Sequence, residues 1–111
     1  MLYSGVVQKG LGRGKTIGFP TANIPLTDDR LSGIYAAHVW IGNTEYVAAV
    51  YADKKRKLLE AHLVGYEGVL YGTEIEVQLF RRLREDAEFE SEEKMKETIK
   101  KDVEAAINFF K

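Results

Sequence analysis

Residues 10–24 combine the residue types that could bind a phosphate group and a metal ion. Four glycines occur between Gly10 and Gly18, with Arg13 and Lys15 among them. Glycine allows a ligand to approach the backbone closely, and backbone N–H groups beside cations suit a phosphate. The stretch therefore indicates a nucleotide phosphate loop. The alternative is a flexible hairpin loop with two exposed cations.

Two common phosphate motifs do not fit this stretch. Gly14-Lys15-Thr16 has the form of a Walker A ending, but that motif requires glycine at position 9, where Lys9 stands. Residues 17–20 end in proline and cannot start the helix that should follow. The dinucleotide-binding fingerprint fails as well, because its third glycine would fall on Lys15.

The segment after the glycines carries two short oxygen-bearing side chains, Thr21 and Asn23. Two residues apart in an extended segment, they point to the same side. A hydroxyl and an amide oxygen suit a hard cation such as Mg²⁺, which shares its coordination shell with water and substrate phosphates. The alternative is that both side chains only hydrogen-bond to nearby backbone.

Glu60 is a candidate general base in an otherwise apolar segment. Period-two alternation places Leu59, Ala61 and Leu63 on one face of a strand, and Glu60 and His62 on the other. A buried carboxylate requires a partner, and a base acts only within hydrogen-bond reach of its hydroxyl. Alternatively, Glu60 faces solvent or pairs with Lys57 or His62.

Composition limits the class of protein. A chain of 111 residues predicts a single domain over 1–111. The net charge of -1 argues against a nucleic-acid partner. Cysteine is absent, which excludes disulfides and thiolate metal sites and fits a cytoplasmic location. No apolar run approaches the ~20 residues that cross a bilayer, so we expect no membrane partner.

The remaining pattern predicts a mainly β fold. Five segments are typical of strands because they alternate or are rich in β-branched and aromatic residues: 2–8, 34–41, 45–51, 58–64 and 74–83. Residues 17–20 are expected to add a short extended piece, because Pro20 disfavours helix at Phe19. The 34–51 hairpin is apolar on both faces, as in a barrel or a sheet covered on both sides.

A charged turn, 53–57, separates two of these strands, and its basic residues either face solvent or border a phosphate site.

Ser91 is a candidate N-cap, followed by apolar residues at helical spacing up to Phe110. The sequence therefore predicts five or six short antiparallel strands in a small barrel, with one C-terminal amphipathic helix packed on the sheet.

Taken in order, the motifs resemble the riboflavin kinase (flavokinase) family. The resemblance rests on short matches that run through nearly the whole chain: Gly12-Arg13, Gly18-Phe19-Pro20-Thr21-Ala22-Asn23, Gly33-Ile34-Tyr35-Ala36, Glu60-Ala61-His62, Leu70-Tyr71-Gly72, Leu83-Arg84 and Phe89-Glu90-Ser91. It implies a six-stranded antiparallel Greek-key β-barrel of the riboflavin kinase-like split-barrel type, with one C-terminal helix.

The resemblance also implies an activity: transfer of the γ-phosphate of ATP to the terminal ribityl hydroxyl of riboflavin, with Mg²⁺, giving FMN and ADP. Glu60 matches the catalytic base, Thr21 and Asn23 the metal and phosphate residues, and Arg84 an arginine near the substrates. The residues that match the nucleotide-binding segment are Gly12, Arg13, Gly14, Lys15, Gly18, Pro20 and Thr21. On this basis we expect Thr21 and Asn23 to face Glu60 across the barrel mouth, and a monomeric, cytoplasmic enzyme.

One segment departs from the family pattern. Relatives commonly carry a longer stretch with a Pro-Thr element before the Glu strand, where this chain has residues 47–53 and the short basic run. Bacterial relatives are often fused to an adenylyltransferase domain, so the chain is either a stand-alone kinase or part of a longer enzyme. The departure leaves an alternative function: a catalytically weak or inactive flavin- or nucleotide-binding protein on the same fold.

Overall fold

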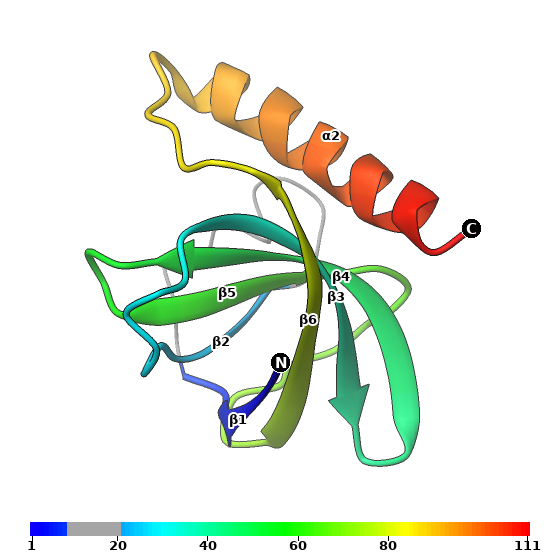
Figure 1. The fold of residues 1–111 in the computed structure, drawn as a ribbon. Helices are drawn as coiled ribbons and strands as arrows, with labels where there is room; N and C mark the ends of the chain where they lie inside the picture. The colour runs from blue at the N-terminus through cyan, green and yellow to red at the C-terminus, as the bar shows by residue number, and fades with distance from the viewer. Residues whose placement is uncertain (9–20) are drawn as a thin grey trace.

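Six antiparallel strands form one curved sheet that closes almost completely into a barrel (Figure 1). The computed structural model describes residues 1–8 and 21–111. The elements are β1 (Leu2–Val6), β2 (Thr21–Pro25), β3 (Gly33–Ile41), β4 (Thr44–Asp53), β5 (Leu58–Leu63), β6 (Glu74–Arg84) and α2 (Glu92–Phe109). The predicted mainly β fold with one C-terminal helix is confirmed. The short extended piece predicted at 17–20 lies outside the described residues.

The strand order β1-β6-β3-β4-β5-β2 contains a Greek key, because β3, β4 and β5 form a meander and β6 returns beside β3. The two edge strands, β1 and β2, are joined just after β1, where the backbone N–H of Gln8 donates to the carbonyl of Asn23 at 2.7 Å. Nearby, a Cβ on Gly5 would lie 3.1 Å from Cβ of Ile24. Glycine therefore lets β1 approach β2 closely enough to close the barrel.

Two separate cores explain why the β3–β4 hairpin is apolar on both faces. One face points into the barrel, where residues such as Val39, Val50 and Ile75 are fully buried. The other face is covered by α2, in a second core made of Ile34, Ala36, Ala49, Val103 and Ala106. Alanines on the strands let the helix approach the sheet closely.

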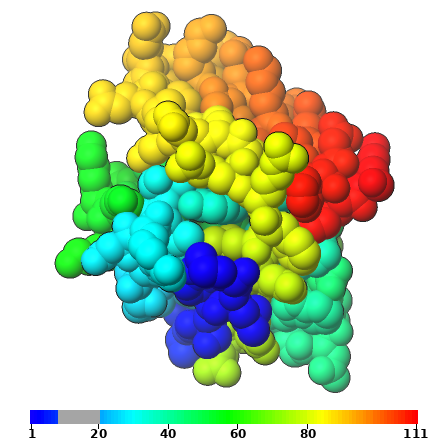
Figure 2. Space-filling view, in the orientation of Figure 1, coloured from blue at the N-terminus to red at the C-terminus, as the bar shows by residue number. Residues whose placement is uncertain are grey.

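Helix α2 begins where the sequence predicted. The side chain of Ser91 accepts a hydrogen bond from the backbone N–H of Lys94, and Glu92 and Glu93 occupy the positive end of the helix dipole. Figure 2 shows residues 85–111, yellow to red, covering one end of the molecule above the strands. Among the described residues, no helix is both long and apolar enough to span a membrane.

Candidate functional site

Strand β5 carries two buried polar side chains on its outer face, toward α2. Leu59, Ala61 and Leu63 point into the barrel core, as the alternation predicted. Glu60 and His62 point the opposite way, and their side chains are only 8% and 3% exposed. Neither residue faces open solvent.

Strand β2 places its two oxygen-bearing side chains beside this pair. In the antiparallel register of β2 with β5, Asn23 lies opposite Glu60 and Thr21 lies opposite His62. The expectation that Thr21 and Asn23 face Glu60 across the barrel mouth is wrong. Because β2 and β5 are hydrogen-bonded neighbours, residues on the same face of the two strands lie side by side on the barrel wall.

Each of these four residues has a buried polar atom without a hydrogen-bond partner among the described residues: Thr21 Oγ1, Asn23 Oδ1, Glu60 Oε1 and His62 Nδ1. His62 Nε2 does lie 3.2 Å from Glu60 Oε1, which is ion-pair distance. The contact does not have the alignment of a hydrogen bond, so Oε1 remains among the unpartnered atoms. A buried, unsatisfied polar atom costs about 1–3 kcal/mol, and four in one place indicate a ligand-binding site.

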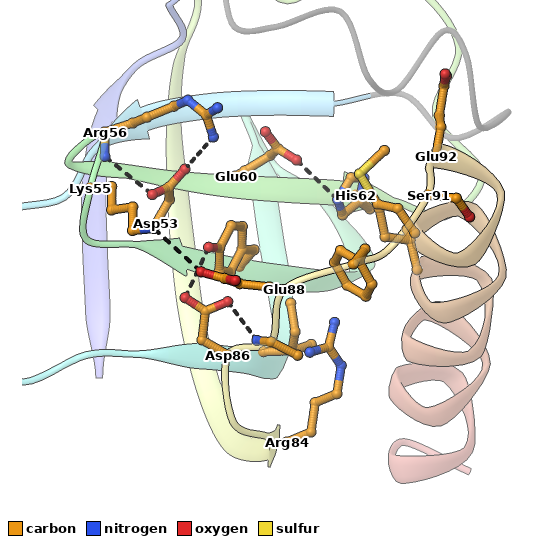
Figure 3. A pocket seen from close by; sticks show the side chains of 16 residues that line it. Asp53, Lys55, Arg56, Glu60, His62, Arg84, Asp86, Glu88, Ser91 and Glu92 are labelled. Carbon is orange, nitrogen blue, oxygen red and sulfur yellow. Dashed lines mark hydrogen bonds and ion pairs between the residues drawn. The ribbon is translucent and has the colours of Figure 1, made fainter.

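A cavity of about 650 Å³ opens beside Glu60 and His62 (Figure 3). Its walls come from the β4–β5 hairpin, the 85–91 segment that follows β6, and the first turns of α2. The lining includes the apolar or aromatic residues Ile34, Tyr51, Ala87, Phe89, Met95 and Ile99. Its charged lining residues are Asp53, Lys55, Arg56, Glu60, Arg84, Asp86, Glu88 and Glu92. The volume is within the range typical of small-molecule sites.

The 85–91 segment is tied across the cavity to the β4–β5 hairpin. The hydroxyl of Tyr51 donates to Asp86 at 3.0 Å. Lys55 Nζ lies 3.9 Å from Glu88, an exposed pair that contributes little energy. The basic residues of the 53–57 segment form a turn, as expected. Asp53, which is buried, stabilises this turn by accepting hydrogen bonds from the backbone and the side chain of Arg56.

Arg84 lines the cavity, but its side chain is also held by α2. Its guanidinium donates two hydrogen bonds of 2.8 Å to the carboxylate of Asp102, and a third to the carbonyl of Glu85. The hydrogen bonds to Asp102 raise the pKa of Arg84 further, so the side chain is always charged. The bidentate pair fixes the end of β6 against the helix and so positions the 85–91 segment.

Part of this site was predicted from the sequence. The described residues include Thr21, Asn23, Glu60 and Arg84, and the first three lie close together. The predicted nucleotide-binding residues Gly12, Arg13, Gly14, Lys15, Gly18 and Pro20 lie outside the described residues. Tyr51, Asp86 and Phe89 were missed as lining residues. The sequence did contain one indication of Phe89, because this residue belongs to the Phe89-Glu90-Ser91 match with the family pattern.

Comparison with known proteins places the chain in a family. The family model for flavokinase (riboflavin kinase) matches residues 1–110. A trifunctional protein RibF/MnmA of Mycoplasmoides gallisepticum is 35% identical over 96% of this chain and 18% of its own length. A bifunctional riboflavin kinase/FMN adenylyltransferase of Buchnera aphidicola is 36% identical over 96% of this chain and 38% of its own length.

A solved structure has the same fold. The crystal structure of a macrolide-efflux protein from Streptococcus pneumoniae superposes with a TM-score of 0.80 and 28% identity, over 96% of this chain and 38% of that one. The chain thus spans less than two-fifths of the length of each of these relatives. The match over residues 1–110, the identity of the curated relatives and the Greek-key barrel agree: the chain belongs to the riboflavin kinase family.

Proposed function

We propose that the chain is an ATP-dependent riboflavin kinase, which transfers the γ-phosphate of ATP to the ribityl 5′-hydroxyl of riboflavin and yields FMN and ADP. Membership of the family supports the reaction class. The observation that carries the proposal is the buried carboxylate of Glu60, which lies beside two unpartnered oxygen ligands and at the wall of a large cavity. Phosphoryl transfer requires this combination of an oriented base, charge neutralisation and a positioned acceptor.

The cavity suits a flavin as the phosphate acceptor. A flavin ring is flat and largely apolar, and Tyr51, Phe89 and Met95 supply aromatic and apolar surface for it. Because Glu60 lines the same cavity, we propose that a ring bound among these residues has its ribityl chain within reach of the carboxylate. Riboflavin is uncharged, so the apolar part of the lining, rather than Lys55 or Arg56, is proposed to bind the ring.

Thr21 and Asn23 fit the metal that the family implies. Their side-chain oxygens, Oγ1 and Oδ1, are buried without a hydrogen-bond partner among the described residues, and hard oxygen ligands suit Mg²⁺. The described residues contain no cluster of three or more His, Asp or Glu side chains that could hold a metal alone. This agrees with an ion that enters with the nucleotide, whose chemistry is to neutralise phosphate charge.

In the proposed reaction, Glu60 accepts the proton of the ribityl hydroxyl. As that oxygen bonds to the γ-phosphorus, the bond between the γ-phosphorus and the β,γ-bridging oxygen breaks, and the electron pair leaves with ADP. The proton remains on the Glu60 carboxyl until it is lost to solvent. Because Glu60 is buried at a fixed register position on β5, its carboxylate is held ready for a hydroxyl that reaches it.

For the nucleotide, the proposal assigns Thr21 and residues outside the described part of the chain. We propose that residues 12–18 cover ATP. Arg84 is proposed as a substrate-binding residue in its present position, because its guanidinium lines the cavity while Asp102 holds it. A monomeric, cytoplasmic enzyme, with riboflavin and ATP as its partners, completes the proposal.

Incubation of the purified chain with riboflavin and Mg-ATP, followed by chromatography for FMN, tests this function. FMN and ADP should form in equal amounts and depend on both ATP and the metal. If flavin binds but no FMN forms at enzyme concentrations near that of the substrate, the kinase function is wrong. The chain would then be a flavin-binding protein on this fold.

A further inference from the structure

His62 lies next to Glu60, and the proposed function so far gives it no role. We propose that His62 is a positioning residue that carries its ring proton on Nε2 and directs it at Oε1 of Glu60, leaving Oε2 for the substrate hydroxyl. This inference rests on the proposed function, because it assigns His62 a task through Glu60. It is carried by the geometry and burial of the pair.

The two side chains share one face of β5 because they are two residues apart on a strand. Nε2 of His62 lies 3.2 Å from Oε1 of Glu60, and the contact is visible in Figure 3. Both residues are at least 94% buried. Burying a carboxylate without a partner is costly, and His62 is the nitrogen-bearing side chain that lies beside it, at 3.2 Å.

The surroundings of the ring indicate which nitrogen carries the proton. Nδ1 of His62 is buried and has no hydrogen-bond partner among the described residues. A proton on Nδ1 alone would leave a buried donor unsatisfied, and the lone pair on Nε2 would face a carboxylate oxygen. A proton on Nε2 instead leaves Nδ1 as an acceptor rather than an unsatisfied donor, and it replaces the lone-pair contact by an N–H beside a negatively charged acceptor.

The present alignment leaves room for adjustment when a substrate binds. The distance between Nε2 and Oε1 suits a hydrogen bond, but the direction of the N–H relative to Oε1 does not. Catalytic hydrogen bonds are often poorly aligned without substrate and tighten in the complex. Thr21 lies opposite His62 in the register. The titratable and charged side chains that share the cavity wall with His62 are Tyr51, Asp53, Lys55, Arg56, Glu60, Arg84, Asp86, Glu88 and Glu92.

The chain contains its own control in a second pair of the same length. His38 Nδ1 also lies 3.2 Å from a carboxylate, that of Glu45, but Glu45 is 40% exposed. The His38 ring stacks on Phe110 at 4.0 Å between centroids, at the far end of α2. His38 does not line the cavity, so its pair with Glu45 should have no effect on the reaction.

Nitrogen-15 NMR of the free, full chain tests the pairing without any activity measurement. The chain has two histidines, so His38→Gln identifies the ring signals of each. A two-bond ¹H–¹⁵N spectrum at neutral pH should show the His62 proton on Nε2. Glu60→Gln should shift the His62 ring signals and not those of His38, and Glu45→Gln should do the reverse. A proton on Nδ1 alone, or His62 signals that Glu60→Gln does not move, would overturn the proposal.

Kinetics of two His62 variants test the role. His62→Gln keeps an amide N–H near the position of Nε2, whereas His62→Asn is too short to do so. His62→Asn should lower kcat roughly 10- to 100-fold, the range typical of groups that orient a functional side chain, with each KM within about twofold. His62→Gln should restore most of kcat, and His38→Gln should leave kcat unchanged.

A purely structural role for His62 predicts a different pattern. Both variants would then lower the yield of folded protein while kcat per folded molecule stayed the same, and this result would overturn the proposal. Equal loss of kcat in His62→Gln and His62→Asn, with both folded, would overturn it too. If the wild-type chain forms no FMN, the proposed function fails instead; FMN formation with a proton on Nδ1 alone overturns only the role of His62.

Discussion

Asn23 and Glu60 are cross-strand partners in the β2–β5 ladder, although the whole β3–β4 hairpin separates them in the chain. The pairing places an amide oxygen directly beside a buried carboxylate, and both have an unpartnered oxygen within the described part of the chain. A backbone ladder fixes this distance more firmly than a loop could. The base and the metal ligand that we propose are therefore positioned by a single strand pair.

Glu60→Gln should reduce FMN formation by at least about 100-fold, because the amide cannot accept the hydroxyl proton. The side chain keeps its shape, so the affinity for riboflavin, measured by quenching of flavin fluorescence, should change less than about twofold. Glu74→Gln, at an exposed position on β6, is the matched control and should retain full activity. Substantial turnover by Glu60→Gln would remove Glu60 from its role as the base.

Asn23→Ala should raise the Mg²⁺ concentration needed for half-maximal activity about tenfold, the equivalent of roughly 1.4 kcal/mol. Because Oδ1 of Asn23 has no hydrogen-bond partner among the described residues, its removal should not lower the free energy of unfolding measured without metal. Asn43→Ala, in the exposed β3–β4 turn, should leave the Mg²⁺ titration unchanged. An unchanged titration in Asn23→Ala itself would mean that Asn23 is not a metal ligand.

Period-two alternation was sufficient to predict which way Glu60 and His62 point, because a strand with one face in the core allows no other register. The N-cap at Ser91 could be predicted as well, since the cap acts through local hydrogen bonds. These predictions succeeded because each depends on residues close together in sequence.

Beyond the 34–51 hairpin, which the structure confirms, the sequence did not reveal which strands are neighbours. Neither composition nor alternation indicated that β2 pairs with β5, and hence the expectation that Thr21 and Asn23 lie across the barrel mouth from Glu60 was wrong. The role of Asp102 was missed for a similar reason. It occupies a helical position where a carboxylate usually faces solvent, and its partner Arg84 comes from a different element. Non-local pairing is set by the tertiary fold, which no short pattern encodes.

The pKa of Tyr3 provides a test of the β1 end of the barrel. Partial burial and the 2.8 Å hydrogen bond that its hydroxyl donates to Asp28 raise this pKa to about 12. A raised pKa means that the stabilisation is fully present below the ordinary tyrosine value of about 10 and is lost as the pH rises toward 12. Asp28→Asn should lower the pKa of Tyr3, measured as the difference in ultraviolet titration between each protein and its Tyr3→Phe form. Asp29→Asn, an exposed neighbour, should not.

Phe89→Ala tests whether the cavity binds the flavin ring. Phe89 is half-buried in the cavity wall, and the guanidinium of Arg84 lies 5.9 Å from its ring centroid. Loss of an aromatic contact worth roughly 1.4 kcal/mol should raise the KM for riboflavin about tenfold, while the KM for ATP stays the same. Phe80→Ala, on β6 outside the cavity, is the control of the same residue type. If both variants raise the KM for riboflavin equally, the ring does not bind beside Phe89.

Asp102→Asn should lower the free energy of unfolding by about 1–3 kcal/mol, the cost of leaving a partly buried charged donor unsatisfied. The carboxylate of Asp102 accepts both hydrogen bonds from Arg84, and an amide can accept only one of them. Because this pair fixes the 85–91 segment beside the cavity, the KM for riboflavin should rise along with the loss of stability.

The control for Asp102→Asn is Glu97→Gln, which breaks an exposed 3.9 Å pair with Lys94 on the same helix and should change the free energy of unfolding by less than about 0.5 kcal/mol. Urea unfolding measures the free energy of each variant. If Asp102→Asn loses stability but binds riboflavin normally, the Arg84–Asp102 pair anchors the helix without shaping the cavity.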